Sequence, residues 1–446
     1  MITPAARIDL PALIDSRPVG RLQITVAALC GAVMLLDGLN TQVIGYLGPA
    51  LSQDWHLARA VLAPVFSAGL AGLMAGLLLI GPLSDKIGRK PAIVLSTLLF
   101  GCFTLLTAAA HGVIDLLIYR TAAGIGLGGA IPNALALTGE YCPKRRRATL
   151  VVIMFCGFSL GSILGGGLSA ALIAHFGWRA IFAIGGVLPL ALTPVLALTL
   201  PESLYFLARK PTGQPQLVKL ARCIDPMQTF PPGVQFTASS ENPSGVPVAQ
   251  LFSNGRAPGT LLLWGVFFMN LMEFYFLQNW LPTIYTDSGL SIETAALITT
   301  LISAGGIAAG LLTGPWMDRA GPNRVLGTLY ALGTVSVAAI GVTVGTTSAS
   351  TWPLVIATFC AGFSVSGGQK TVNAAAVLFY PPEVRSTGTG WALGIGRLGG
   401  ILGPAAGGWL LAQGWSNANI FKLAALPMLC ATALVLATPS VPVRTT

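Results

Sequence analysis

Long apolar stretches alternate with short polar ones along the whole chain. A helix needs about 20 predominantly apolar residues to cross the hydrocarbon core of a bilayer. The stretches that meet this requirement begin near Leu22, Val61, Pro91, Gly112, Thr149, Trp178, Gly259, Thr294, Val325, Trp352, Thr387 and Phe421. A polar, proline-rich segment from about Pro201 to Pro258 separates the first six from the last six. The pattern predicts an all-α membrane protein with twelve transmembrane helices.

The same pattern divides the chain into two halves with polar segments around them. In order, we expect an N-terminal segment, a first six-helix half, a central loop, a second six-helix half and a tail: 1–21, 22–200, 201–257, 258–438 and 439–446.

Composition agrees with a bilayer rather than with water. Hydrophobic residues make up 54% of the chain and charged residues only 9%, whereas a soluble domain is about one quarter charged. The net charge of +10 does not indicate a nucleic-acid partner, because the charges lie in short clusters between apolar runs. The seven cysteines show neither metal-ligand nor disulfide spacing. We therefore expect a lipid-embedded chain with no metal site.

The basic residues gather in alternate loops. If both termini are cytoplasmic, most of the 25 lysines and arginines fall in cytoplasmic segments, including the clusters 86–90 and 144–147. Cytoplasmic loops of membrane proteins carry such an excess of Lys and Arg. The charge pattern predicts cytoplasmic termini, and we expect the bacterial inner membrane as the location.

Short motifs recur in the two halves in the same order. GPLSDKIGRK at 81–90 returns as GPWMDRAGPNR at 314–324, and the Tyr-x-Pro-x-x-Arg pattern at 141–146 returns at 380–385. Such internal repeats are typical of transporters that bind their substrate near the midplane, between two pseudo-symmetric halves. Alternating access then comes from rocking of one half against the other.

Two of these motifs carry a resemblance to a known superfamily. The stretch 81–90 is similar to the loop signature between helices two and three of the major facilitator superfamily. The stretch 120–126, RTAAGIG, resembles the fourth-helix motif of the same superfamily. The resemblance implies the major facilitator fold.

A closer resemblance, over nearly the whole chain, is to the aromatic acid:proton symporter family. It is carried by DGLNTQ at 37–42, MFCGF at 154–158, PES at 201–203 and GWALGIGR at 390–397. EYCP at 140–143 is most similar to the 4-hydroxybenzoate and protocatechuate permeases of that family. The resemblance implies inward transport of a small aromatic carboxylate with protons, driven by the proton gradient without another cofactor.

One position departs from the family pattern. The family usually has acidic residues at both ends of an Asp-Gly-x-Asp motif, and here the second of them is Asn40. An amide forms hydrogen bonds but does not titrate, so any proton role of this position is lost.

Ionisable residues inside the apolar runs are candidates for the mechanism, because a charge at the bilayer centre costs several kcal/mol. They are Asp37, Arg120, Glu140, Glu273, Lys370 and Arg397. Asp37 is expected to load and release a proton and to contact the substrate, unless it forms a structural ion pair. Asn40 and Thr41, three and four residues on, share its helix face and are expected to line the substrate path.

Two arginines are candidate anion contacts. Guanidinium binds carboxylate in a bidentate manner, so Arg397 either receives the substrate or pairs with a protein acid such as Asp37. Arg120 either extends outward as an anchor or helps to couple proton and substrate.

Other candidates are less constrained by the sequence. Glu273 is either a second titrating group or a residue at the outer headgroups, and Lys370 is either a second anion contact or a residue that extends toward the cytoplasm. Gln369 and Asn373 are candidate hydrogen-bond partners for a ring hydroxyl. Trp391 is a candidate stacking surface, although most such aromatics simply pack or lie at the interface.

Charged residues at the cytoplasmic helix ends are predicted to gate the inner side. In the first half these are Asp85, Arg89 and Glu140, and Asp318 and Arg319 occupy the repeated loop of the second half. Ion pairs among them would close the inner gate, whereas the alternative is ordinary surface charge.

Other functions remain open. A carrier of the same fold for another organic anion or a sugar fits the helix pattern, and so does a proton-driven exporter. A membrane enzyme or sensor is disfavoured, because the sequence has no nucleophile constellation, metal cluster or Walker-type loop. We expect a monomeric transporter, not an enzyme, whose partners are the bilayer, protons and an aromatic acid.

Overall fold

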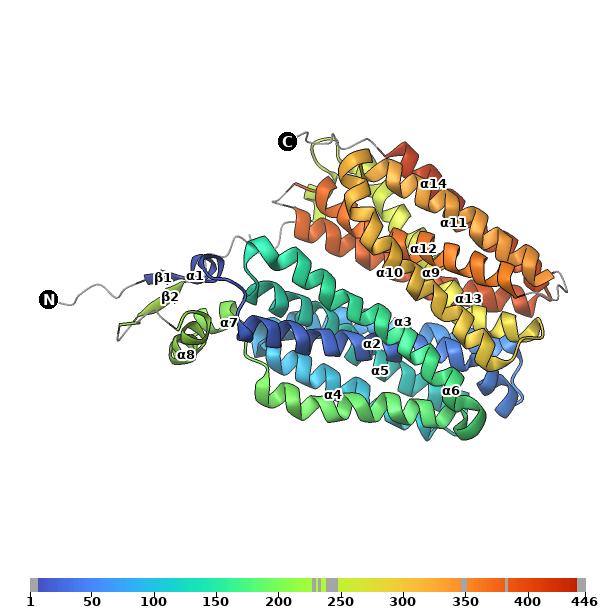
Figure 1. The fold of residues 1–446 in the computed structure, drawn as a ribbon, viewed down its shortest axis with the longest axis horizontal. Coiled ribbons are helices and arrows are strands. Elements are labelled where there is room, and N and C mark those ends of the chain that lie inside the picture. Colours follow the sequence, from blue (N-terminus) through green and yellow to red (C-terminus); the bar gives the residue numbers. More distant parts are fainter. Residues whose placement is uncertain are drawn as a thin grey trace.

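The computed structural model describes residues 7–226, 230–231, 234–237, 248–345, 351–381 and 384–438. The predicted tail 439–446 lies outside them. The described chain is almost entirely helical (Figure 1), with helices α1 (Leu10–Ser16), α2 (Arg21–Asp54), α3 (Leu62–Ile87), α4 (Arg89–Ala108), α5 (Val113–Tyr141), α6 (Lys144–Thr199), α7 (Leu204–Ala208), α8 (Gln214–Ile224), α9 (Ala257–Asp287), α10 (Ile292–Ala320), α11 (Pro322–Gly345), α12 (Trp352–Phe379), α13 (Arg385–Ala412) and α14 (Asn417–Ala437). Shorter elements are the 3-10 helices η1 (Arg59–Val61), η2 (Pro211–Gly213) and η3 (Val248–Phe252) and the strands β1 (Arg7–Asp9) and β2 (Gln235–Thr237).

Helices α2 to α6 form the first bundle. α6 is two helices joined at Gly177, whose φ of 69° interrupts the helical backbone. Glycine adopts this conformation without a steric penalty, and the chain turns back along the bundle. Within the bundle α2 packs against α6, α3 packs against α5, and α4 packs against both α5 and α6.

Helices α9 to α14 form the second bundle and repeat this arrangement. α9 packs against α13, α10 packs against α12, and α11 packs against α12 and α14. With α6 counted twice, each bundle of the described chain has six helices. Nine of the described helical runs are long and apolar enough to cross a membrane by length and composition. The predicted all-α fold of two pseudo-symmetric halves is confirmed.

Glycines allow the helices inside each bundle to approach closely. A Cβ atom added at Gly38 of α2 would collide with the carbonyl oxygen of Phe158 on α6, and one added at Gly161 of α6 would collide with that of Leu35 on α2. Small residues at helix interfaces bring backbones together in this way inside membranes. These glycines therefore fix α2 and α6 as one unit.

The two bundles meet through fewer helices. α3 packs against α13, α6 against α10, and α2 against α9. Ser67 donates a 3.0 Å hydrogen bond to the carbonyl of Ile401, and Ser303 donates a 2.9 Å hydrogen bond to Ser162.

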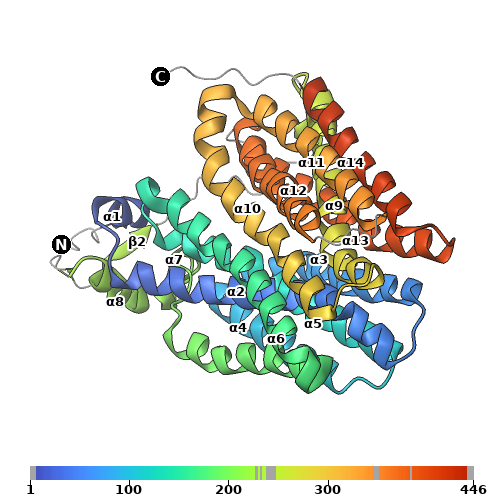
Figure 2. The ribbon, with the colours of Figure 1, turned by 45° about the vertical axis from the view of Figure 1, so that its right-hand side comes forward.

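We call the end at which α1 and α8 lie the terminal end, and the other the far end. Arg59 and Asp287 form an ion pair of 2.5 Å between the bundles at the far end. Figures 1 and 2 both show the bundles diverging toward the terminal end. The bundles are thus joined in the middle and at the far end.

A small cap covers the terminal end of the first bundle. It consists of residues 7–17 and 204–237, as far as these are described, and we call it the terminal cap. Strand β1 pairs with β2 in parallel, and Arg17 forms a 2.6 Å ion pair with Asp225. The structure thus joins the N-terminal segment to part of the central loop, a contact that the sequence did not indicate.

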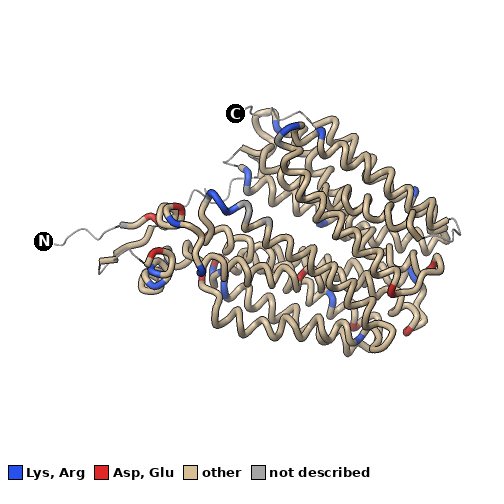
Figure 3. Tube along the Cα trace, viewed as in Figure 1, with Lys and Arg blue, Asp and Glu red and all other residues tan. Residues whose placement is uncertain are grey.

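Charged side chains avoid the middle of the bundles. Lys and Arg gather toward the terminal end, and only a few charges lie along the helices (Figure 3). Asp37, Arg120, Glu273, Lys370 and Arg397, which were predicted to carry function, are among the charged residues inside the long helices.

The glycine contact between α2 and α6 leads to a stability prediction. Gly161→Ala should lower the free energy of unfolding by about 1–3 kcal/mol, because the added methyl group overpacks the α2–α6 contact. Gly167→Ala on the same helix is the control, because a Cβ there would meet no atom within 4 Å. Thermal unfolding in detergent, followed by size-exclusion fluorescence, measures both. Equal melting temperatures for the two variants would contradict the assignment.

Candidate functional site

Asp37 lies at the middle of α2 with no exposed surface. Its Oδ1 accepts a 2.9 Å hydrogen bond from Thr41, and its Oδ2 is buried with no hydrogen-bond partner in the part of the chain that the structure describes. The guanidinium of Arg397 on α13 lies within electrostatic range. The carboxyl group therefore faces a cation from the other bundle without forming a described ion pair with it.

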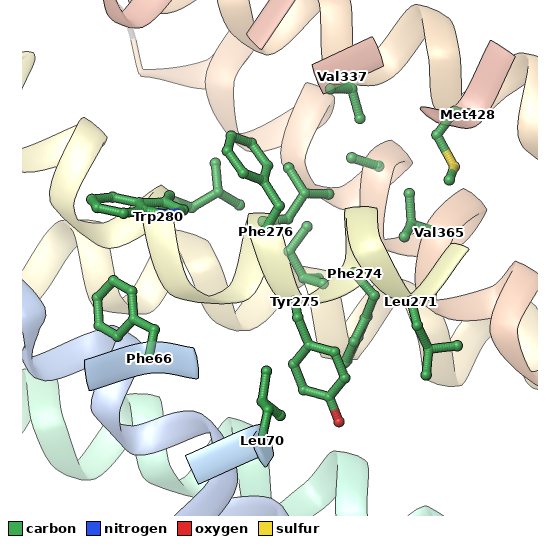
Figure 4. Packing of buried hydrophobic residues seen from close by; sticks show 14 of the residues in the cluster. Phe66, Leu70, Leu271, Phe274, Tyr275, Phe276, Trp280, Val337, Val365 and Met428 are labelled. Carbon is green, nitrogen blue, oxygen red and sulfur yellow. The ribbon is translucent and has the colours of Figure 1, made fainter. Parts of the chain in front are cut away.

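Tyr275 connects Arg397 to the contact between the bundles. Arg397 donates a 2.6 Å hydrogen bond to the Tyr275 hydroxyl, and its guanidinium carbon lies 6.0 Å from the centre of that ring. Figure 4 shows the Tyr275 side chain extending from α9 toward α3, on which Phe66 and Leu70 lie. Asp37, Tyr275 and Arg397 thus form a polar group contributed by three helices of two bundles.

Arg120 is the most deeply buried cation of the site. Only 2% of it is exposed, so it does not extend outward as an anchor. Its Nη2 donates a 2.9 Å hydrogen bond to the backbone carbonyl of Asn40, while Nε and Nη1 have no hydrogen-bond partner among the described residues. Its guanidinium carbon lies 5.7 Å from the centre of the Phe182 ring. Leaving two nitrogen donors of a buried cation without partners is costly.

A cavity between the bundles brings these residues together. Its polar lining consists of Thr41, Arg120, Tyr275 and Asn279, and Phe66 and Leu70 belong to its apolar lining. Its volume of about 10 Å³ holds about one water molecule. In this conformation the cavity is too small for an organic molecule, so a ligand would enter only when the bundles shift. A cation beside apolar walls suits a small anion with an apolar body.

Asn40 points away from this cavity. Its amide nitrogen donates 3.0 Å hydrogen bonds to the carbonyls of Leu36 and Gly185, the latter on the second part of α6. Its side chain therefore joins helices inside the first bundle, and its backbone carbonyl holds Arg120. Both Asn40 and Thr41 were predicted to line the substrate path. In the structure Thr41 lines the cavity, whereas the Asn40 side chain points into the first bundle.

Glu273 and Lys370 lie inside the second half. Glu273 is 1% exposed, and its Oε1 has no hydrogen-bond partner among the residues that the structure describes, so it does not reach the headgroups. Lys370 is half-buried and donates a 2.6 Å hydrogen bond to the carbonyl of Gly306 on α10. Gln369 beside it is half-buried and Asn373 is exposed. The structure does not bring these side chains to the described cavity.

Trp391 lies nearer the terminal end than Arg397. Six residues separate the two on α13, which is about 9 Å along a helix. The Trp391 ring stacks on that of Trp264, with centroids 5.9 Å apart, and the residue is 45% exposed. Its described partner is thus another protein ring, away from the cavity.

Arg89 is the hub of a polar cluster at the terminal end of the first bundle. Its guanidinium donates hydrogen bonds to Ser84 at 2.5 Å, Asn133 at 3.0 Å and Asp85 at 2.7 Å. All these partners belong to the first half. The predicted gating residues Asp85 and Arg89 are therefore paired with each other in this conformation.

Glu202 anchors the same cluster, and the sequence had shown it only as part of the PES motif, without a role. Its Oε1 accepts hydrogen bonds from the backbone N–H groups of Arg89 at 2.8 Å, Lys90 at 3.1 Å and Ser203 at 2.7 Å. Ser203 in turn donates a 2.5 Å hydrogen bond to Glu140. The carboxylate satisfies the free N–H groups at the start of α4. An acid directly after the last apolar run of the half was the available signal.

The corresponding residues of the second half are less informative. The side chain of Asp318 lies outside the described part of the chain, and Arg319 is exposed. Among the described residues, no group of three or more His, Cys, Asp or Glu side chains is arranged to hold a metal ion.

Comparison with known proteins identifies the family. The model of the Major Facilitator Superfamily matches residues 30–222 and 263–446. The chain belongs to this superfamily of membrane transporters. The two matched segments cover most of the first bundle and most of the second.

Curated relatives narrow the resemblance to aromatic acid permeases. The chain is 41% identical to a gallate transporter of Pseudomonas putida, over 99% of this chain and 97% of that protein. It is 40% identical to a 4-hydroxybenzoate transporter of Pseudomonas aeruginosa, over 96% and 95%. The resemblance found in the sequence motifs is confirmed at the level of the family.

A solved structure agrees with the fold. A bacterial homolog of the human lysosomal transporter Spinster, crystallised in an inward-facing and unoccupied conformation, superposes with a TM-score of 0.64. The two chains share 16% identity, over 94% of this chain and 96% of the other. This likeness concerns the fold alone.

The Glu202 contacts lead to a prediction on stability. Glu202→Ala should lower the free energy of unfolding by about 1–3 kcal/mol, because it leaves buried backbone donors at the start of α4 unpaired. Asp85→Ala is the matched control, since its exposed ion pair with Arg89 contributes at most about 1 kcal/mol. Thermal unfolding of the purified variants measures the difference. A control that is destabilised as much as Glu202→Ala would refute the anchoring role.

Proposed function

We propose that the chain carries a small aromatic carboxylate, such as 4-hydroxybenzoate or protocatechuate, inward together with protons. The observation that carries the proposal is the buried Arg120 beside a cavity between the bundles, whose Nε and Nη1 have no partner among the described residues. The similarity to a gallate transporter and to a 4-hydroxybenzoate transporter supports an aromatic acid as the substrate.

In this proposal the substrate carboxylate binds Arg120. A carboxylate accepts charge-assisted hydrogen bonds from guanidinium N–H groups, and Nε and Nη1 supply such donors on two different edges of the Arg120 guanidinium. The ring would lie against the apolar lining around Phe66 and Leu70 once the cavity widens. Arg397 and Lys370 remain proposed secondary anion contacts that act in other conformations.

Asp37 is the proposed proton carrier. When ionised, it attracts Arg397 across the contact between the bundles, and when protonated it no longer does. Loading and release of the proton therefore change the attraction between the two halves. Because Asn40 does not titrate, we propose Glu273 as a second proton site, since its buried carboxyl group has an unpartnered oxygen.

Rocking of the two halves, residues 22–200 and 258–438, is the proposed means of alternating access. The positive-inside rule places the terminal end, with its basic clusters, in the cytoplasm. The bundles are joined in the middle and at the far end, which supports an inward-facing conformation here. Closure of the terminal end would then bring Asp85, Arg89 and Glu140 toward the Asp318 and Arg319 loop.

The remaining proposals follow from this scheme. The protein works as a monomer in the bacterial inner membrane, with both termini in the cytoplasm. The proton gradient supplies the energy and no cofactor is needed.

Arg120→Ala should weaken binding of the aromatic acid by about tenfold or more, because it removes charge-assisted hydrogen bonds to the carboxylate. Uptake of radiolabelled 4-hydroxybenzoate into proteoliposomes, measured over a concentration series, gives the change in KM. Arg179→Ala is the control, since Arg179 is an exposed cation at the far end, paired with Asp54. If KM responds equally in both variants, the carboxylate does not bind Arg120.

Asp37→Asn should abolish accumulation of the aromatic acid under an imposed pH gradient, because the amide cannot carry a proton. Exchange of labelled for unlabelled substrate at equal pH should persist, because exchange needs no net proton movement. Both assays use the same proteoliposomes. Accumulation that survives Asp37→Asn undiminished would remove Asp37 from the coupling mechanism.

A further inference from the structure

Asn279 on α9 presents an unused hydrogen-bond acceptor to the cavity. The residue is 4% exposed and lines the cavity with Arg120. Its amide nitrogen donates a 2.7 Å hydrogen bond to the backbone carbonyl of Tyr275. A backbone carbonyl only accepts, so this contact fixes the orientation of the amide. The Oδ1 atom is therefore left as an acceptor, and among the described residues it has no hydrogen-bond partner.

The other polar side chains of the cavity differ from Asn279 in whether they can donate or accept a further hydrogen bond. Arg120 only donates. The Thr41 hydroxyl donates to Asp37, and the Tyr275 hydroxyl accepts from Arg397 and retains its own hydrogen as a donor. Asn279 contributes a carbonyl oxygen that needs a donor. A ligand that completes this cavity must therefore pair an anionic group with a hydrogen-bond donor.

Arg120 and Asn279 lie at matching depths on opposite bundles. Arg120 is seven residues from the start of α5 at Val113, and Asn279 is eight residues from the end of α9 at Asp287. At 1.5 Å per residue these positions lie about 10 and 12 Å inside the far end. An anion whose charged group binds Arg120 of the first bundle would thus have its opposite end facing Asn279 of the second bundle.

We propose that Asn279 is a specificity-determining residue that accepts a hydrogen bond from a hydroxyl group on the substrate ring. The inference rests on the proposed function and deepens it: the favoured substrates are hydroxylated aromatic acids rather than benzoate itself. The carboxylate binds the first bundle through Arg120, and the ring hydroxyl binds the second through Asn279. Such a substrate connects the two moving halves, whereas an acid without the hydroxyl leaves the Asn279 oxygen unpaired.

Fluorine in place of the hydroxyl group tests this directly, because it is of similar size and donates no hydrogen bond. In proteoliposomes containing the wild-type protein, 3- and 4-hydroxybenzoate are compared with 3- and 4-fluorobenzoate as competitors of labelled uptake. At least one hydroxylated acid should compete about tenfold more strongly than its fluorinated counterpart, as expected for the loss of one buried hydrogen bond. Equal competition within both pairs would overturn the inference.

The Asn279→Leu variant should remove this preference, because the hydroxylated acids lose their acceptor and then compete no more strongly than the fluorobenzoates. Asn270→Leu is the matched control, because Asn270 is a buried asparagine of the same helix that donates to the carbonyl of Val365 and does not line the cavity. The control should keep the hydroxyl preference. Retention of the preference in Asn279→Leu would assign the hydroxyl contact to another residue and refute the proposal.

The experiments also distinguish a failure of the proposed function from a failure of the role of Asn279. Asn279→Ser shortens the side chain and should also lose the preference, so the test stands even if the leucine variant does not fold. Wild-type protein that takes up none of the aromatic acids would refute the proposed function itself. Uptake of hydroxylated and fluorinated acids with equal affinity would refute only the role of Asn279.

Discussion

The close approach of helix backbones at glycine positions is the contact on which the architecture depends. Lipid tails are as apolar as leucine, so helices in a bilayer associate through packing and hydrogen bonds rather than through the hydrophobic effect. At Gly38 and Gly161 the backbones of α2 and α6 leave no room for a Cβ atom. The contact between the bundles depends instead on fewer helices and on separable polar contacts such as Ser162 with Ser303. Two rigid bodies joined by a weaker contact are what a rocking carrier requires.

The two bundles differ in how completely the ionisable groups at their contact are hydrogen-bonded. The first bundle holds Asp37 and Arg120 with part of their hydrogen-bonding capacity unused, while the second supplies Arg397 already bonded to Tyr275. Buried ionisable groups are expensive in a membrane, and full pairing within one bundle would reduce the expense. Their incomplete pairing is therefore the part of the structure least explained by stability. It marks the place at which a ligand, a proton or the opposite bundle completes the interactions.

Much of this was predictable from the sequence, because bilayer physics dictates long apolar runs and the repeat fixes two halves. Asp37, Arg120 and Arg397 were identified because a charge inside an apolar run is conspicuous. Asn279 was not, since a neutral amide among apolar residues carries no such signal. Asn40 was expected to face the path with Asp37, but a step of three residues rotates a side chain by about 60° around the helix, enough to turn it toward Gly185. The terminal cap was missed because its polar, proline-rich segment has no periodicity.

The pairing of β1 with β2 has a consequence for how the protein is made. Residues 7–9 leave the ribosome before the first bundle, yet their strand partner, residues 235–237, follows the whole of that bundle. The N-terminal segment must therefore wait, unpaired, while six helices enter the membrane. Domains generally fold as units, the N-terminal one first during synthesis. The strand pair then completes the first half as a finished folding unit before the second half has been translated.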